Sequence, residues 1–172
     1  MTCSAAILLL ALCSIVSRSS ATPTLESLKQ ALYTDQNVLL LKKASDNNDN
    51  FVQETCVYIK KISTYQGKYN FRRSSKVDDK WYHIQLYGVL STGDDEAVLE
   101  VGESRVADGI PYIMRYWNVE EHCGILAHEA GVHEECDLYV WDENVDTKAC
   151  YEAFLQHCPK GEKHLFYSPA CQ

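Results

Sequence analysis

The residues with the clearest capacity for chemistry lie in segment 127–137, which reads AHEAGVHEECD. His128 and His133 flank an acidic residue, as do the histidines of the H-E-x-x-H motif in zinc hydrolases. In that motif the histidines are four residues apart, so both point from one face of a helix to the metal. Here they are five apart, which places the second about 140° round a helix from the first. Gly131 and Val132 also disfavour a helix, so the segment predicts a hairpin without a catalytic zinc site.

The other polar residues show no pattern of nucleophilic catalysis. The sequence contains no Gly-x-Ser-x-Gly, and the nearest match, GESR at residues 102–105, lacks the second glycine. We therefore expect a protein that is not an enzyme and that needs neither a metal nor a cofactor. The two histidines can still approach each other across a hairpin. The more informative residues are Cys136 and Asp137. We expect Cys136 to link a strand to the last helix, and the position of Asp137 in the strand allows its side chain to face the interior.

The first 21 residues have the features of a secretory signal. Residues 5–13, AAILLLALC, form an apolar run that is too short to span a bilayer. Ser19 and Ala21 suit the −3 and −1 positions of a cleavage site after Ala21. The alternative is that residues 1–21 remain as a membrane anchor. No later stretch is apolar enough to span a membrane, so we expect a secreted, extracellular domain over residues 22–172.

Size and charge limit the class of protein. Removing the signal from 172 residues leaves 172 − 21 = 151, the size of one compact domain. The formal net charge of the whole chain is −8, and loss of Arg18 makes it 15 − 24 = −9. An acidic domain of this kind does not favour nucleic acid or anionic membranes as partners.

Six of the eight cysteines fall in the mature domain. Cys3 and Cys13 belong to the signal, which leaves Cys56, Cys123, Cys136, Cys150, Cys158 and Cys171. An even number in an exported chain predicts three disulfides, for which fifteen pairings are possible. This density is too low for a fold built by disulfides alone, so a hydrophobic core must supply most of the stability.

Hydrophobic periodicity predicts short strands between two helices. Apolar residues at helical spacing predict a short helix over residues 24–33. Eight segments that alternate, or that are short apolar runs, predict strands at residues 38–43, 55–64, 68–73, 79–90, 97–101, 110–117, 123–128 and 136–142. A last helix is capped by Asp146 or Thr147 and ends before Pro159 and Gly161.

Strands without intervening helices indicate an antiparallel meander. An exported sheet of eight such strands is most simply closed into a barrel, because closure removes the free edges. The predicted fold class is therefore all-β: an eight-stranded antiparallel barrel with a short N-terminal helix, a C-terminal helix packed outside and three disulfides. A barrel of eight strands can hold one small ligand.

Several short motifs resemble the tick salivary lipocalins, the histamine-binding-protein family, in their order and spacing. They are Asn37-Val38, Thr55-Cys56-Val57, Leu86-Tyr87-Gly88, Glu121-His122-Cys123, CDLYVW at 136–141, Cys150 and YSPAC at 167–171. The resemblance covers most of residues 25–172 and implies a lipocalin barrel. It suggests the bridges Cys56–Cys171 and Cys123–Cys150, and with them Cys136–Cys158. It also implies a secreted salivary protein that sequesters a host mediator and blunts inflammation or immunity.

The sequence has only some of the residues that form the histamine pocket in this family. Asp137 stands in place of a pocket glutamate, Asp79 matches another pocket acid, and Phe51 falls where the family has a pocket tryptophan. Gly124, however, replaces an aspartate, and Tyr112 stands where another pocket aspartate would be. A buried ammonium group needs carboxylates around it. We therefore expect at least one amine site to be lost.

The aromatic residues favour an apolar ligand. The chain has eleven Tyr, three Trp and four Phe, and Tyr87, Tyr112 and Tyr139 are candidates to line the pocket. Arg115, if it points inward, would meet a carboxylate head group. For each aromatic residue, packing in the core or on the outer surface is the alternative. We expect a lipid, such as a sterol, leukotriene or fatty acid, as in the cholesterol-binding Japanin-like subgroup. The alternative ligand is a biogenic amine, histamine or serotonin.

A different class of function remains open. Loops 44–54, 91–96 and 129–134 could bind host immune-cell or plasma proteins without use of the pocket. The expected partners are thus a small host ligand or such proteins, with no nucleic acid and no membrane span.

Overall fold

The structure, a computed structural model, describes residues 22–45, 54–104, 109–131, 133–141 and 147–171. The predicted signal over residues 1–21 and the predicted pocket residue Phe51 lie outside these ranges. The elements in chain order are α1 (Leu25–Leu32), β1 (Val38–Ser45), β2 (Thr55–Tyr65), β3 (Lys68–Val77), β4 (Lys80–Gly93), β5 (Glu96–Gly102), β6 (Ile110–Asn118), β7 (Cys123–Ala130), β8 (His133–Val140), α2 (Lys148–His157), β9 (Glu162–Leu165) and a 3-10 turn (Pro169–Cys171).

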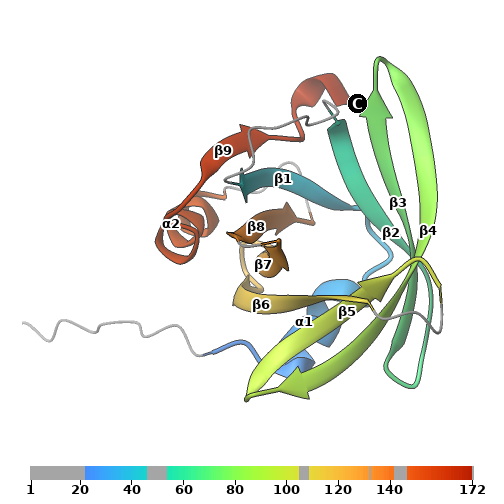
Figure 1. Ribbon diagram of the computed structural model, residues 1–172, viewed down its shortest axis with the longest axis vertical. Helices are drawn as coiled ribbons and strands as arrows, with labels where there is room; N and C mark the ends of the chain where they lie inside the picture. Colours follow the sequence, from blue (N-terminus) through green and yellow to red (C-terminus); the bar gives the residue numbers. More distant parts are fainter. Residues whose placement is uncertain (1–21, 46–53, 105–108, 132, 142–146, 172) are drawn as a thin grey trace, which may run out of the picture.

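Eight strands form the predicted antiparallel barrel (Figure 1). Strands β2 to β8 pair in chain order, and β8 then pairs with β1. The barrel closes where Val38 and Leu39 of β1 pair with Ile59 and Tyr58 of β2. The sequence prediction of an all-β, eight-stranded barrel is therefore confirmed.

A ninth strand, which the sequence analysis did not predict, extends the closure. Beyond Leu39, β1 is no longer paired with β2, and Lys42 to Ser45 pair with β9 instead. Next to β9, Phe166 bridges the two sides of the seam. Its amide donates to Leu41 O at 3.1 Å, and its carbonyl accepts from the amide of Cys56. The chain after α2 is thus part of the barrel wall.

The hairpin of segment 127–137 is tighter than predicted. Strand β7 runs to Ala130 and pairs it with His133, so β8 begins three residues earlier than expected. Gly131 has φ of 68° at the turn, a conformation that suits glycine. The consequence is that His128 is a strand residue opposite Glu135, well away from His133 at the hairpin end.

Helix α1 packs across one end of the barrel. Thr24 caps it in a reciprocal capping box with Ser27. Leu28 and Leu32 are buried in a core cluster that includes residues of several strands. Trp141, just after β8, donates its indole N–H to the carbonyl of Ala31. These contacts close that end of the barrel. Neither this helix nor any other helix among the described residues is long and apolar enough to cross a membrane.

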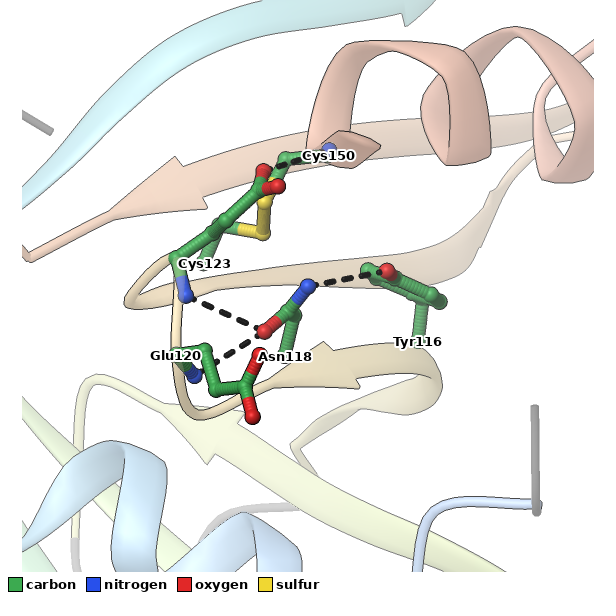
Figure 2. Close-up of a disulfide and its surroundings, with 6 residues drawn as sticks. Tyr116, Asn118, Glu120, Cys123 and Cys150 are labelled. Atoms are coloured by element: carbon green, nitrogen blue, oxygen red, sulfur yellow. Dashed lines mark hydrogen bonds between the residues drawn. A yellow bond between two sulfur atoms is a disulfide. The ribbon is translucent and has the colours of Figure 1, made fainter. Parts of the chain in front are cut away.

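Helix α2 lies outside the barrel, as predicted, and a loop carboxylate binds its N-terminus. Thr147 is the N-cap but makes no side-chain capping bond. Instead, Glu121 Oε2 accepts from the amide of Cys150 at 3.0 Å. Asn118 holds this loop, because its Oδ1 accepts from the amides of Glu120 and Glu121 at 2.9 and 3.0 Å (Figure 2). Glu121 thus binds a backbone amide of the first turn, whereas Thr147 makes no capping bond; the other predicted cap, Asp146, lies outside the described residues.

All three suggested disulfides are confirmed. They join Cys56 to Cys171, Cys123 to Cys150 and Cys136 to Cys158. Each links a residue of a barrel strand to the segment 150–171. The C-terminal part of the chain is therefore fastened to β2, β7 and β8.

Candidate functional site

The barrel encloses a cavity of about 130 Å³. Eight of its lining side chains are apolar: Leu40, Ile59, Phe71, Leu86, Leu99, Val101, Leu126 and Phe166. Six are polar: Lys43, Glu54, Arg73, Tyr112, Asp137 and Tyr139. The cavity is therefore a mainly apolar space with a few polar groups, the usual composition of a site for a small molecule.

Asp137 is the polar residue that lacks a complete set of partners. Its side chain is 4% exposed. Tyr139 donates its hydroxyl to Asp137 Oδ2 at 3.2 Å, whereas Oδ1 has no hydrogen-bond partner among the described residues. Burial raises the pKa of Asp137, although Lys43 and His128 act in the opposite direction. The cavity thus presents one buried acceptor with capacity for a further donor.

The cations at the cavity are paired with other carboxylates. Arg73 makes a two-point ion pair with Glu54, one contact of which measures 3.2 Å. Ser75 also donates to Glu54 Oε1 at 3.2 Å. Burial acts to raise the pKa of Glu54, but Arg73, Ser75 and Lys43 together bring it below its usual range. Arg73 is therefore already neutralised, which weakens any case for it as the anchor of an acidic ligand.

Lys43 is neutralised in the same way by Glu135. The two side chains form an ion pair, and Ser45 Oγ donates to Glu135 Oε1 at 2.8 Å. His128 Nε2 lies 3.4 Å from Glu135 Oε2. Burial favours a raised pKa at Glu135, yet the contacts with Lys43 and Ser45 hold it below its usual range. The result is a compact polar network beside Asp137.

His128 itself is buried and packs on Tyr112. The two ring centroids are 4.3 Å apart. Burial lowers the pKa of His128, and its Nδ1 has no hydrogen-bond partner among the described residues. Burial also raises the pKa of the Tyr112 hydroxyl. These shifts favour neutral forms of both side chains at neutral pH.

Three of the predicted pocket residues come together at the cavity, and three do not. Asp137, Tyr139 and Tyr112 line it. Asp79 lies at the β3–β4 turn with its side chain 98% exposed, 3.6 Å from Lys76 Nζ.

Tyr87 and Arg115 lie away from the cavity. Tyr87 lines a separate hollow of about 260 Å³ with residues such as Asn70 and Glu100. Arg115 makes ion pairs with Glu96 and Glu134, the latter at 3.0 Å. The condition for its predicted role, an inward side chain, is therefore not met.

The sequence analysis did not predict that Lys43, Glu54, Arg73, His128 and Glu135 lie at or beside the cavity. Two of these had a usable signal, since residues 135, 137 and 139 share a strand face, as do 126 and 128. The pairing of Glu54 with Arg73 had none, because it joins positions 19 residues apart.

His128 and His133, the two histidines of segment 127–137, do not form a metal site. His128 is buried, and His133 is exposed at the hairpin end. Among the described residues, one group of three metal-ligand types lies close together: Glu121, Cys123 and Cys150. Both of these cysteines are in a disulfide, so their thiolates are not available to a metal.

Comparison with known proteins agrees with this architecture. A family model described as "Tick histamine binding protein" matches residues 18–172. Among solved structures, Japanin from Rhipicephalus appendiculatus, bound to cholesterol, is 16% identical with a TM-score of 0.59, and the match covers 82% of this chain and 98% of that one.

Two other solved structures show the same fold. The AM182 serotonin complex is 14% identical with a TM-score of 0.64, and the match covers 88% of this chain and 95% of that one. The allergen Per a 4 from cockroaches is 12% identical with a TM-score of 0.59, over 88% and 94%. No curated protein matches the sequence.

Proposed function

The chain belongs to the tick histamine-binding protein family, and from that premise we propose that it is a secreted, non-enzymatic carrier of a small host ligand. The ligand binds in the barrel, and its removal from host tissue dampens inflammation or immunity. The signal is removed during export by cleavage after Ala21. The three disulfides support an exported protein, because such bonds persist in oxidising compartments.

The observation that carries the proposal is the unpartnered Oδ1 of Asp137 inside a mainly apolar cavity. A buried acceptor without a partner is costly, and a ligand that donates a hydrogen bond removes that cost. The matching ligand has an apolar body and one donor group. It does not need a charge to offset Lys43 or Arg73, because Glu135 and Glu54 already do so.

A lipid with a hydroxyl group, such as a sterol, is our first candidate. Eight of the fourteen cavity residues are apolar and would contact the lipid body. Burial raises the pKa of Asp137, so the site penalises a charge on this carboxyl group, which suits an uncharged hydroxyl as its partner. Japanin, which has the same fold, was solved with cholesterol.

A biogenic amine is the second candidate, and the size of the cavity favours it. At about 130 Å³ the cavity is close to the volume of about 150 Å³ that accepts benzene in an engineered protein. An ammonium group would also find a carboxylate in Asp137, and Tyr112 and Tyr139 would supply aromatic faces. AM182 was solved with serotonin.

Native mass spectrometry of the secreted protein tests the proposal. We expect a co-purified small molecule, or a mass shift when cholesterol, a leukotriene, histamine or serotonin is added to stripped protein. Asp137→Asn should weaken binding by about 10- to 100-fold, the loss expected for one hydrogen bond to a charged or buried partner. Asp79→Asn, at the exposed turn, is the matched control.

The four ligands separate the two candidates. Binding of cholesterol alone supports the lipid, and binding of serotonin or histamine alone supports the amine. A barrel that purifies empty and binds none of them contradicts the carrier function. Action through the loops on host proteins would then be the remaining alternative.

A further inference from the structure

Tyr112 lines the candidate cavity, and its hydroxyl group has no hydrogen-bond partner among the described residues. It lies in β6, where its ring packs on the ring of His128 in β7, with 4.3 Å between the two centroids. His128 is only 8% exposed and is paired with Glu135 of β8. The ring of Tyr112 is thus held against the barrel wall, and the described contacts leave its hydroxyl group unused.

Tyr112 and Asp137 lie close enough to act on each other electrostatically. Burial raises the pKa of Tyr112, and the carboxyl group of Asp137 raises it further. Tyr112 therefore keeps its proton at neutral pH and can donate it in a hydrogen bond. Asp137 Oδ1 likewise has no partner among the described residues. Both side chains line one cavity of only about 130 Å³, so a single small group of a ligand can meet both.

The other charged and aromatic polar side chains of the cavity already have partners. Tyr139 donates its hydroxyl to the second carboxyl oxygen, Asp137 Oδ2, at 3.2 Å. Arg73 and Lys43 are each neutralised by a glutamate. Among the described residues, the unused capacity of the site is therefore one donor, at Tyr112, and one acceptor, at Asp137.

We propose that Tyr112 determines the specificity of the carrier, because its hydroxyl donates to a ligand oxygen whose own proton is donated to Asp137 Oδ1. The inference rests on the proposed function and specifies an alcohol as the polar group of the ligand. A hydroxyl oxygen accepts one hydrogen bond while its proton is donated in another, so one group satisfies both residues. An ether oxygen accepts only, and an ammonium group donates only.

An ammonium group would leave the site incompletely paired. It can donate to Asp137 Oδ1 and also to the oxygen of Tyr112, but the phenolic proton of Tyr112 would then have no acceptor among the described residues. A buried donor without a partner costs free energy. The ammonium group must also lose its water shell, which an uncharged hydroxyl does at a lower cost. The pairing at Tyr112 therefore favours the alcohol over the amine.

Three ligands that share one apolar body test this choice. They are 2-phenylethanol, phenethylamine and 2-phenylethyl methyl ether, which carry an alcohol, an amine and an ether on the same phenylethyl group. In titrations of stripped wild-type protein, followed by calorimetry or NMR, we expect the alcohol to bind most tightly. The ether should bind about 3- to 10-fold more weakly than the alcohol, because it has no proton for Asp137 Oδ1. The amine should bind at least about threefold more weakly, because it leaves the Tyr112 donor unpaired.

Tyr112→Phe removes the hydroxyl and keeps the ring that packs on His128. It should weaken binding of 2-phenylethanol by about 3- to 10-fold, the loss of one hydrogen bond. Binding of phenethylamine should change by less than about twofold, because one weak bond and one unpaired donor are lost together. Tyr87→Phe is the matched control, since Tyr87 lies in the separate hollow and no affinity should change. Thermal unfolding verifies that each variant is folded.

A second measurement follows Tyr112 in the wild-type protein. The ring carbon that bears the hydroxyl, Cζ, has a ¹³C resonance that responds to hydrogen bonding of that hydroxyl. Saturation with 2-phenylethanol should shift this resonance in Tyr112 and leave that of Tyr87 in place. Phenethylamine should give a smaller shift at Tyr112, because its ammonium group cannot accept the phenolic proton.

Three results would overturn the inference and leave the carrier function intact. They are an ether or an amine that binds as tightly as the alcohol, an equal loss of alcohol and amine affinity in Tyr112→Phe, and a Tyr112 resonance that the bound alcohol does not shift. In each case Asp137→Asn can still weaken binding, which keeps the ligand in the barrel. Failure of the carrier function would look different: none of these three ligands, and none of cholesterol, leukotriene, histamine and serotonin, would bind, and both proposals would fall.

Discussion

Replacing Asp137 with asparagine should stabilise the ligand-free protein at neutral pH. Asparagine keeps the shape of the side chain, and its oxygen can still accept from the Tyr139 hydroxyl, 3.2 Å from Oδ2 in the wild type. The change removes a charge from a side chain that is 4% exposed. Since burial raises the pKa of Asp137 despite Lys43 and His128, the folded state disfavours the ionised carboxylate.

The size of the effect follows from the unpartnered Oδ1. A buried polar atom without a partner costs about 1–3 kcal/mol, and a charged one costs more. The new amide nitrogen also lacks a partner, so the gain is the difference between a charged and a neutral group, about 1–2 kcal/mol. In a domain of this size that raises Tm by about 2–8 °C.

The pH dependence gives the sharper test. A raised pKa lets the folded state keep a proton that the unfolded state has released. The wild type therefore loses stability as the pH rises from the usual value of 3.8 towards the folded pKa, and the variant does not. The advantage of the variant should be greatest near neutral pH and vanish below about pH 3.8.

Urea and thermal unfolding of stripped protein at several pH values measure this difference. Asp79→Asn is the control, because its side chain is 98% exposed and should change stability by less than about 0.5 kcal/mol. A variant at Asp137 that is no more stable than wild type near pH 7 would refute the reasoning. So would an advantage that is constant with pH.

Three further predictions concern the wall of the barrel and its charges. Gly161→Ala should lower the unfolding free energy by about 3 kcal/mol, because φ is 76° and a Cβ would lie 2.8 Å from the Ser45 backbone. Gly131→Ala is the control and should cost about 1 kcal/mol, because a Cβ there would have nothing within 4 Å. Equal losses in the two variants would contradict this reasoning. Burial lowers the pKa of His128, so the wild type should lose stability as the pH falls below its usual value of 6.5; in urea titrations His128→Gln should lack that part of the loss. Arg115→Ala should change the unfolding free energy by less than about 1 kcal/mol, since the ion pairs of Arg115 are partly exposed. Ligand affinity should not change, because these ion pairs lie away from the cavity. A clear loss of affinity in calorimetry would instead place Arg115 in the ligand site.

The barrel could be predicted because its strands carry their own signal. Alternating apolar residues mark β2 and β4, and tight turns separate them, so order and direction follow from local sequence. Strand β9 could not be found in this way. It has four residues, Glu162–Leu165, and exists because β1 offers an edge that β2 leaves open. Its signal is in the tertiary pairing and not in its own residues.

The candidate site shows the same limit at the level of single side chains. Asp137 and Tyr139 are two apart in one strand, so they share a face whichever way the strand points. Tyr112 and Arg115 are three apart and would face the cavity together only with an irregularity between them. The bulge lies between Met114 and Tyr116, and Arg115 makes its ion pairs away from the cavity. A shift of one residue is invisible in the sequence and reverses the face.

The three disulfides have a consequence for the order in which the molecule is made. Each joins a strand cysteine to one synthesised later, and Cys56 must wait 115 residues for Cys171. At about 5–20 residues per second, that wait lasts roughly 6–23 s. Four other cysteines, Cys123, Cys136, Cys150 and Cys158, are synthesised during this interval and can compete for Cys56. No native bridge can form before its later cysteine is synthesised, and earlier oxidation would give wrong pairs that thiol–disulfide exchange has to correct. In a pulse-chase experiment, the native set of bridges should form only after synthesis of the C-terminal segment.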